Sequence, residues 1–470
     1  MQPSPHACKT PELDTEPDLN APTTLLLTPA ACGSLAAPTS PPPEPEPLPW
    51  VTPSFWQQCI QAHAQVTDFL VSPGDYSNWG RLVVYERDGR PERKRVIRYW
   101  GPGREAHPVH RLESGPGYEA TIGGFSFADA SHWILHGLTI RHPLPTGQFV
   151  GFIGYSGMGA GSSKVIVDSL LMENATGYGM RISKASDSCV QNSVMRNMAL
   201  VTFDRPGIQI KPGDNTGAHP TTGNRIVNNE IVNHTDAIAL TNGTGEIDGT
   251  VIAENDFYFT PDFISRLEDG KIGCTENGID IKIGSSDPAN PVRIENNRIW
   301  GSRFLRTCSG TGDGIVIHQQ TKNLVLRQNV IFDVPVGITI KPFPDFSPQT
   351  RNVLIEKNLF YGIRGFRGDQ PLPKHDAGVL SLQTPAIVRD NVFAHSERLF
   401  TGDVRDEITG ASQFERNQVV AVPDLTHLPP LFTKKNKVFA TVPASARDYV
   451  FPRSRWQCCS AVILKQAFVP

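Results

Sequence analysis

The chain has 470 residues, of which 39% are hydrophobic and 19% are charged, and it contains 41 glycines and 40 prolines. Its 44 basic and 47 acidic residues give a net charge of −3 at pH 7, which excludes a strongly basic surface of the kind that binds nucleic acid non-specifically. No segment approaches the roughly 18 consecutive apolar residues of a membrane-spanning helix, so we expect no membrane span.

Residues 1–50 differ in composition from the rest of the chain. They hold 13 of the 40 prolines, with one lysine against six acidic residues, which predicts a disordered, Pro-rich tail. A short apolar stretch at 25–37 is compatible with secretion. However, it has no basic region before it and lies far from Met1, so we expect no clear signal peptide at Met1.

Residues 51–130 are expected to form an N-terminal cap and the first coils of a repeat. The segment 54–65 has the pattern of an amphipathic helix with Ser54 as its N-cap. Such a helix would cover the open end of a solenoid, where apolar side chains and strand edges are otherwise exposed. A basic hairpin is expected over 83–99.

A repeat then runs from about residue 130 to 420. Each unit holds a short apolar strand, an Asn or Ser, and a second apolar residue. Successive units are 24 to 42 residues apart, a period typical of a solenoid or a propeller. The repeated polar residues are Ser169, Ser193, Asn229, Asn255, Asn297, Asn329, Asn358, Asn391 and Asn417.

A second strand with strict alternation of apolar and polar residues follows most of these positions, as in Gly278-Ile-Asp-Ile281 and Gly314-Ile-Val-Ile317. This alternation predicts one buried and one wet face. A propeller blade needs four strands in about 40 residues, more than each unit offers. The pattern therefore predicts an all-β fold, a parallel β-helix solenoid over 131–420 with asparagines stacked between coils, and a C-terminal cap over 421–470.

The repeat resembles the right-handed parallel β-helix, pectin-lyase-like superfamily, a resemblance that extends over about residues 70–420. It implies the fold. The superfamily includes lyases, hydrolases, epimerases and binding proteins, so function has to be argued from the residues of a site.

Stacking of equivalent residues about 4.8 Å apart in neighbouring coils allows columns to be predicted from the aligned repeats. One outward column runs Arg181, Gln209, Ala239, Asp280, Val316 and Thr339, and the next runs Ser183, Lys211, Thr241, Lys282, His318 and Lys341. A turn column before the strand holds Asp236, Asn277 and Asp313, with Glu276 beside it. Carboxylates, a lysine and a histidine are thus expected on one patch.

This patch suggests calcium-assisted β-elimination from an acidic polysaccharide. Removal of the proton beside a uronate carboxylate requires that the carboxylate be neutralised, which oxygen-ligated calcium can do. The predicted metal ligands are Asp236, Glu276, Asp280 and Asp313. Lys282 is the predicted base and His318 the predicted acid, and Lys211 and Lys341 are predicted to bind substrate carboxylates. Such a protein would act outside the cell or at its surface.

The acids followed by Lys282 on a strand are similar to the arrangement of pectate lyases and of chondroitinase B and alginate lyases, although the spacing differs and no contiguous motif matches. The order of motifs from His234 through Glu276 and Asp313 to Lys341 resembles that of polygalacturonase-type glycosidases. Glu276 and Asn277 stand where those enzymes have an Asp pair, and Asp313 stands where they have a histidine. A non-catalytic glycan-binding or surface protein is the third alternative.

A structural interpretation stays open for each of these groups. Asp and Asn before Gly are common turn formers, as at Asn277 and Asp313, and the same structural interpretation applies to Asp236, which precedes Ala237. Lys211 and Lys341 fit a solvated face better than a binding role. The eight cysteines include no CxxC pair, which disfavours structural zinc; Cys274 and Cys308 occupy similar points of successive repeats and could form a disulfide.

Overall fold

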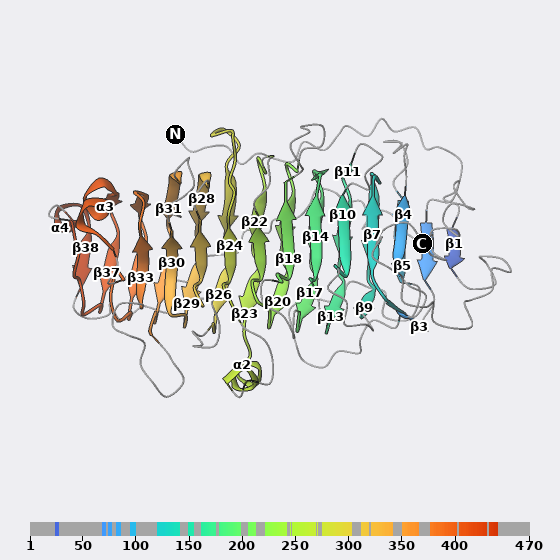
Figure 1. Ribbon diagram of the computed structural model, residues 1–470, viewed down its shortest axis with the longest axis horizontal. Coiled ribbons are helices and arrows are strands. Elements are labelled where there is room, and N and C mark those ends of the chain that lie inside the picture. The colour runs from blue at the N-terminus through green and yellow to red at the C-terminus, as the bar shows by residue number, and fades with distance from the viewer. Residues whose placement is uncertain are drawn as a thin grey trace, which may run out of the picture.

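Three parallel sheets wind together along one axis in the computed structural model, and most coils contribute a strand to each sheet (Figure 1). The chain is a right-handed parallel β-helix, as the repeat predicts. The structure describes residues 24–27, 68–71, 74–77, 81–85, 95–99, 120–141, 149–154, 161–174, 178–198, 205–212, 221–241, 245, 247–268, 270, 275–302, 312–318, 321–341, 350–365, 377–401, 404–429 and 432–439.

Sheet A contains the strand that precedes the repeated Asn or Ser of each unit. Its neighbours pair in parallel without exception among the described strands. In sheet order it comprises β1 (Thr24–Leu27), β2 (Asp68–Val71), β5 (Arg95–Tyr99), β8 (Trp133–His136), β12 (Ile166–Asp168), β16 (Cys189–Gln191), β19 (Arg225–Val227), β22 (Val251–Ala253), β25 (Val292–Glu295), β28 (Lys322–Arg327), β31 (Arg351–Glu356), β34 (Ile387–Arg389) and β36 (Gln413–Glu415).

Sheet B contains the strand that follows the Asn or Ser. It comprises β3 (Gly74–Tyr76), β6 (Ala120–Ile122), β9 (Thr139–Arg141), β13 (Leu171–Glu173), β17 (Val194–Arg196), β20 (Glu230–Val232), β23 (Asp256–Tyr258), β26 (Arg298–Trp300), β29 (Val330–Phe332), β32 (Leu359–Tyr361), β35 (Val392–Ala394), β37 (Gln418–Val420) and β38 (Lys437–Phe439).

Sheet C contains the strand with the alternating pattern and faces the viewer in Figure 1. It comprises β4 (Leu82–Tyr85), β7 (Phe125–Ala128), β10 (Gly151–Gly154), β14 (Met180–Ser183), β18 (Ile208–Lys211), β21 (Ile238–Leu240), β24 (Ile279–Ile281), β27 (Ile315–Ile317), β30 (Val336–Ile340) and β33 (Gly378–Leu382). A separate short pair joins β11 (Ser162–Ser163) to β15 (Ala185–Ser186).

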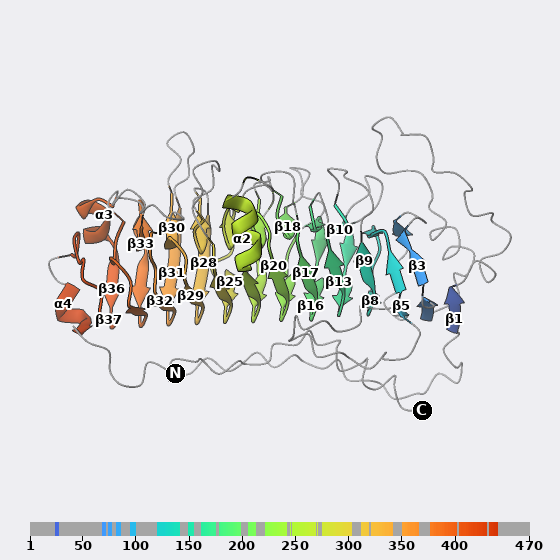
Figure 2. The ribbon, with the colours of Figure 1, turned by 90° about the horizontal axis from the view of Figure 1, so that it is seen from below.

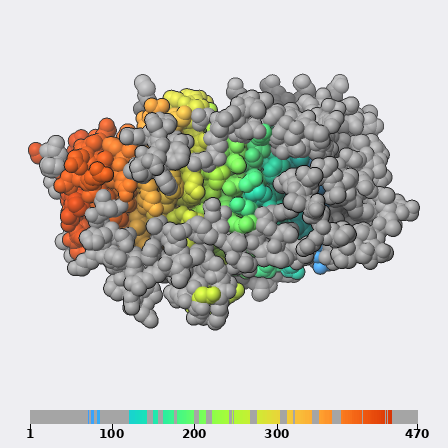
Figure 3. Space-filling model, viewed as in Figure 1, coloured from blue at the N-terminus to red at the C-terminus, as the bar shows by residue number. Residues whose placement is uncertain are grey.

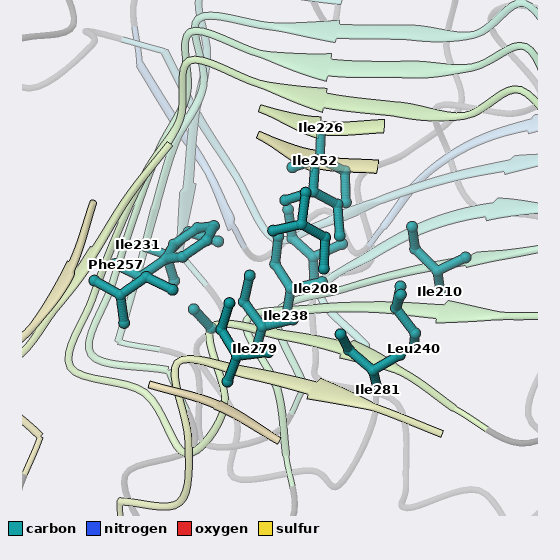
Figure 4. Close-up of a cluster of buried hydrophobic side chains, with 14 of the residues drawn as sticks. Ile208, Ile210, Ile226, Ile231, Ile238, Leu240, Ile252, Phe257, Ile279 and Ile281 are labelled. Carbon is teal, nitrogen blue, oxygen red and sulfur yellow. The ribbon is translucent and has the colours of Figure 1, made fainter. Parts of the chain in front are cut away.

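Apolar side chains from the three sheets fill the interior as stacked columns. Figure 4 shows Ile208, Ile238 and Ile279 from successive sheet C strands pointing inward, and residues from the other two sheets pack toward them. These three side chains are fully buried. Because each coil places the same residue type at the same point, the core continues from coil to coil, and no coil could bury its apolar face alone.

The predicted asparagine ladder is present and is buried. Asn297 accepts from the backbone N–H of Asn255 at 3.0 Å and from its Nδ2 at 2.9 Å. Asn297 donates through its own Nδ2 to the backbone oxygen of Ile252 at 2.9 Å and to Oδ1 of Asn329 at 3.0 Å. The residue before Asn297, Asn296, has a φ of 58°, so the chain turns sharply there. The ladder continues to Asn436, beyond the last position found in the repeat.

Glycine precedes several sheet C strands because coils approach closely there. A Cβ on Gly278 would lie 2.5 Å from the backbone oxygen of Gly314, and a Cβ on Gly314 would lie 2.7 Å from that of Gly337. Both distances are far inside van der Waals contact. The recurring glycine before the strand therefore follows from the stacking of successive turns.

In the described part of the chain three short helices lie beside the sheets: α2 (Pro261–Glu268), α3 (Asp406–Ala411) and α4 (Phe432–Lys435). Figure 2 shows α3 and α4 at the end of the solenoid that holds β36 and β37, and α2 midway along it. The predicted capping helix at 54–65, and Cys274 and Cys308, lie outside the described residues. Within 1–50 only β1 is described, and it pairs with β2. None of the described helices is both long and apolar enough to span a membrane.

Candidate functional site

The outward columns of sheet C have the register expected from the repeat. Asp280 on β24 pairs with Ala239 on one side and with Val316 on the other. Ala239 in turn pairs with Gln209, and Gln209 pairs with Arg181. The second column continues at the strand ends, where the Lys282 N–H donates to the oxygen of Leu240. Residues from segments far apart in sequence are therefore brought to one face.

The prediction that this face is exposed to solvent is wrong for the column that contains Asp280, from Gln209 to Thr339. Gln209, Asp280 and Thr339 are 7%, 1% and 3% exposed. The patch is a buried polar cluster, where electrostatic interactions are stronger than in water.

Asp280 is the centre of this cluster. Its Oδ2 lies 2.7 Å from Nζ of Lys282, which follows it on the same coil. Its Oδ1 lies 3.0 Å from Nε2 of His318, on the next coil. Lys282 and His318 retain partial exposure, with 27% and 15% of their side chains accessible. The predicted base and acid thus converge, with a buried carboxylate holding both.

Two opposing effects act on the pKa of the Asp280 carboxyl. Burial raises it, whereas the hydrogen bond from His318 and the nearby charge of Lys282 lower it, and the net result is a pKa below the ordinary value. Asp280 is therefore an anion at neutral pH. Its two carboxylate oxygens fix the orientation of the two neighbouring side chains.

Asp236 lies in the turn before β21 and is fully buried. Its Oδ1 accepts from the backbone N–H of Asn277 at 3.0 Å and from Nδ2 of Asn277 at 3.1 Å. Burial raises the pKa of Asp236 well above its ordinary range, and the charges of Glu276 and Asp280 raise it further. These bonds match the turn-forming interpretation, while the shared charge effects place Asp236 electrostatically beside Asp280.

Asp313 is also buried and lies in the turn before β27. Its Oδ2 accepts a hydrogen bond of 2.5 Å from the Thr339 hydroxyl, on the next coil. Partly buried Glu276 donates its backbone N–H to the oxygen of Thr235. His234, the first residue of the polygalacturonase-like order, is buried with its ring 4.5 Å from that of Phe259, and burial lowers its pKa to about 3.

Lys211 and Lys341 are located at the two sides of this cluster. Lys211 is exposed at the end of β18, and Lys341 is partly exposed just after β30. The Lys341 N–H donates to the oxygen of Ile317 at 2.8 Å, which places it one coil beyond His318. Neither lysine forms an ion pair with another described residue, so both ammonium groups can meet an anionic ligand.

The four predicted calcium ligands do not form a cation cage in this arrangement. Among the described residues, no group of three or more His, Cys, Asp and Glu is disposed to hold a metal ion. Both oxygens of Asp280 face cationic or hydrogen-bonding nitrogens, and Asp236 has the raised pKa of a carboxyl that resists ionisation. A cation would have to displace Lys282 or His318 from Asp280.

Asp236 gives a test of these electrostatics through stability. A folded-state pKa above the unfolded value means that the unfolded state loses its proton first as pH rises, so ionisation of Asp236 favours unfolding. We expect Asp236→Asn, which can retain the Oδ1 bonds to Asn277, to gain stability relative to wild type by about 1–3 kcal/mol at pH 8. The gain should shrink toward pH 4. Urea unfolding at both pH values measures it, and a pH-independent difference would contradict the assignment.

No function was predicted from the sequence for two arginines of the same face, Arg181 and Arg205. Arg181 stands in the aligned outward column, but Arg205 was not recognised. Arg205 is two residues before Gly207, as Glu276 is two residues before Gly278, so extension of the turn column by two coils would have found it. Both arginines lie beside the ring of Tyr178.

Comparisons with known proteins support the fold. No protein-family model matches the chain, and no curated protein matches it. A solved structure of a mannuronic acid specific polysaccharide family 6 lyase from human gut microbiota is similar with a TM-score of 0.52 and 13% identity, covering 80% of this chain and 86% of that one.

Two further structures match less closely. The surface adhesin PfbA of Streptococcus pneumoniae gives a TM-score of 0.49 at 14% identity, covering 82% of this chain and 86% of the adhesin. The PL6 family alginate lyase AlyGC gives 0.48 at 14% identity, covering 83% of this chain and 53% of the lyase. The chain thus spans about half of AlyGC, and at these identities the likeness concerns the fold alone.

Proposed function

We propose that this protein is a carbohydrate-active β-helix enzyme that cleaves an acidic, uronate-containing polysaccharide by β-elimination on the outer face of sheet C. The observation that carries the proposal is the contact of Asp280 with both Lys282 and His318. It places two proton-transfer groups side by side on adjacent coils. Such a substrate places the protein outside the cell or at its surface.

In the proposed reaction, Lys282 in its neutral amine form takes the proton from the carbon next to the uronate carboxylate. The electron pair of that C–H bond forms a carbon–carbon double bond as the neighbouring bond to the glycosidic oxygen breaks. Protonated His318 supplies a proton to the departing oxygen. Asp280 holds both groups and stabilises the ammonium that forms on Lys282. Each turnover then ends with the proton of Lys282 returned to solvent and His318 reprotonated.

Developing charge on the uronate carboxylate also needs cations nearby. Lys211 lies at the end of β18 and Lys341 just after β30, two strands to either side of β24 on the same face, and they are the proposed carboxylate-binding groups. Figure 3 shows the described residues of this face as a band that runs along the solenoid axis from teal through green to yellow. A chain of sugars lying along this band would pass over Asp280 and its two partners.

Ultraviolet absorbance during incubation with pectate, alginate or chondroitin sulfate tests the proposal. Elimination creates a conjugated double bond at the new uronate end, so absorbance should rise with at least one substrate. New reducing ends without absorbance would instead indicate a glycoside hydrolase. Binding without either product would indicate a non-catalytic glycan-binding protein, and both results would overturn the proposed elimination.

Calcium stays a separate proposal, since carboxylate neutralisation by a metal would assist the same step. Asp236, Glu276, Asp280 and Asp313 are the residues predicted to hold it. If calcium is required, activity should fall by at least tenfold in excess chelator and return when calcium, but not sodium, is added back. Unchanged activity in chelator would leave neutralisation to protein cations and exclude the calcium requirement.

A further inference from the structure

A second polar cluster lies on sheet C, toward the N-terminal end from Asp280. The guanidinium carbon of Arg181 lies 3.7 Å from the centroid of the Phe149 ring and 5.7 Å from that of Tyr178. The guanidinium carbon of Arg205 lies 4.9 Å from the Tyr178 centroid. The Phe149 and Tyr178 rings are themselves 4.3 Å apart. Two cations and two aromatic rings thus form one compact group, which we call the arginine cluster.

The arginine cluster lacks an internal counter-charge. Within the described residues, neither Arg181 nor Arg205 is ion-paired with a carboxylate, whereas Arg141 and Arg196 share Glu173. Nη1 of Arg205 is buried without a hydrogen-bond partner. A buried guanidinium nitrogen with no acceptor is costly, so this geometry is one that an external anion would stabilise.

Hydrogen bonds hold the side chains of the arginine cluster in position. Nε of Arg181 donates to Oε1 of Gln209 at 2.6 Å, and the partly buried Arg81 side chain donates to the backbone oxygen of Phe149. Burial lowers the pKa of Arg181 to about 10, so the side chain keeps its charge at neutral pH. With its Nε engaged by Gln209, the two terminal nitrogens of Arg181 form the edge that can bind a carboxylate end-on.

The arginine cluster shares its face with the proposed reaction centre. Register along sheet C runs from Arg181 to Gln209, then to Ala239 and Asp280. Three strand spacings separate Arg181 from Asp280, or about 14 Å. Gln209 and Ala239 stand between them in this column and are buried, so the accessible route between the two places runs over the partly exposed side chains of Arg181 and Lys282. A polymer along the axis could reach both places.

We propose that Arg181 and Arg205 form a carboxylate-binding subsite that holds a uronate residue of the acidic polysaccharide several sugars away from the bond over Asp280. The subsite takes the identity of its ligand from the proposed function. Arg181 binds the carboxylate through its terminal nitrogens, and Arg205 adds a second cation across Tyr178. The subsite therefore selects for charged sugars at a distance from the chemistry.

Binding of defined oligosaccharides tests this subsite. Isothermal titration with oligogalacturonate and oligomannuronate hexasaccharides, in a Lys282→Ala background to prevent cleavage, is compared with titration of their carboxyl-reduced neutral forms. We expect Arg181→Gln and Arg205→Gln each to weaken binding of an acidic hexasaccharide by about 10–100-fold. Arg181→Lys should weaken it less, since it keeps the charge but loses the planar fork.

Arg351→Gln is the matched control, because Arg351 is exposed on sheet A, away from this face. Its removal should change the dissociation constant less than twofold, and thermal unfolding of every variant verifies its fold. Arg205→Gln offers an independent readout if Arg181→Gln is unstable. Unchanged binding in both arginine variants, or equal binding of neutral and acidic hexasaccharides, would overturn the subsite.

The outcomes separate this inference from the proposed function. Arginine-dependent binding without any absorbance rise in the Lys282-containing protein would uphold the subsite and overturn elimination. An absorbance rise together with binding that does not depend on the arginines would uphold elimination and overturn the subsite. Absence of both binding and cleavage across the probes would overturn both.

Discussion

Replacement of Lys282 with alanine is expected to lower the turnover of an acidic polysaccharide by about 10²–10⁴-fold, the usual contribution of a positioned base or acid. Lys282 is the partly exposed amine whose Nζ is 2.7 Å from the buried Asp280, and in the proposed reaction it takes the proton. Initial rates of absorbance increase, measured over a range of substrate concentrations, give kcat and KM separately. The loss should lie in kcat.

Lys282→Arg distinguishes a proton-transfer role from a structural one. An arginine keeps a positive charge beside Asp280 but does not release its proton in a protein. It should therefore preserve thermal stability and still abolish most turnover. Lys434→Ala, at an exposed position of α4, is the matched control and should leave kcat unchanged. Full activity in Lys282→Arg would rule out Lys282 as the base.

Asn297→Ala is expected to destabilise the fold by about 3–5 kcal/mol, near the upper end for a single substitution. Asn297 is fully buried. Its amide satisfies the backbone N–H of Asn255 and the backbone oxygen of Ile252, in addition to the side chains of two neighbouring ladder residues. Each buried group left without a partner costs about 1–3 kcal/mol. Urea unfolding followed by circular dichroism measures the difference.

Asn290→Ala provides the comparison, because Asn290 is exposed and its amide donates to nearby Asp287. We expect that change to cost less than about 1 kcal/mol. Similar losses for Asn290→Ala and Asn297→Ala would show that burial of the ladder amides does not contribute to stability. A solenoid can also lose cooperativity when one coil is weakened, so transition slopes need to be compared as well as midpoints.

Repetition made the fold predictable from sequence. Most units carry an Asn at a turn and apolar residues at alternate positions. A unit whose own pattern is weak can therefore still be assigned by alignment with the other units. The register of Arg181, Gln209, Ala239 and Asp280 followed from aligning units. Asn436 was missed because α3 and α4 interrupt the pattern around the last coils.

For the candidate site, the sequence predicted which residues lie near one another but not which of them are in contact. Alignment placed Asp280, Lys282 and His318 on adjacent coils, but it could not show that Asp280 is buried between the other two. Alignment gave equal standing to Asp313, whose carboxylate accepts from Thr339, and to Asp236, which bonds to Asn277. These side-chain directions depend on rotamers and local packing, which a repeat pattern does not specify.

The sequence by itself thus determined the coil architecture, the buried ladder and the membership of each column, because a parallel solenoid converts sequence period directly into spatial stacking. Tertiary structure decided which polar groups in a column are buried and which partner each one meets. The joint engagement of Asp280 by Lys282 and His318, and the lack of a described counter-ion for Arg181, arise between coils. They depend on distances of a few ångströms, over which hydrogen bonds and charge interactions are gained or lost.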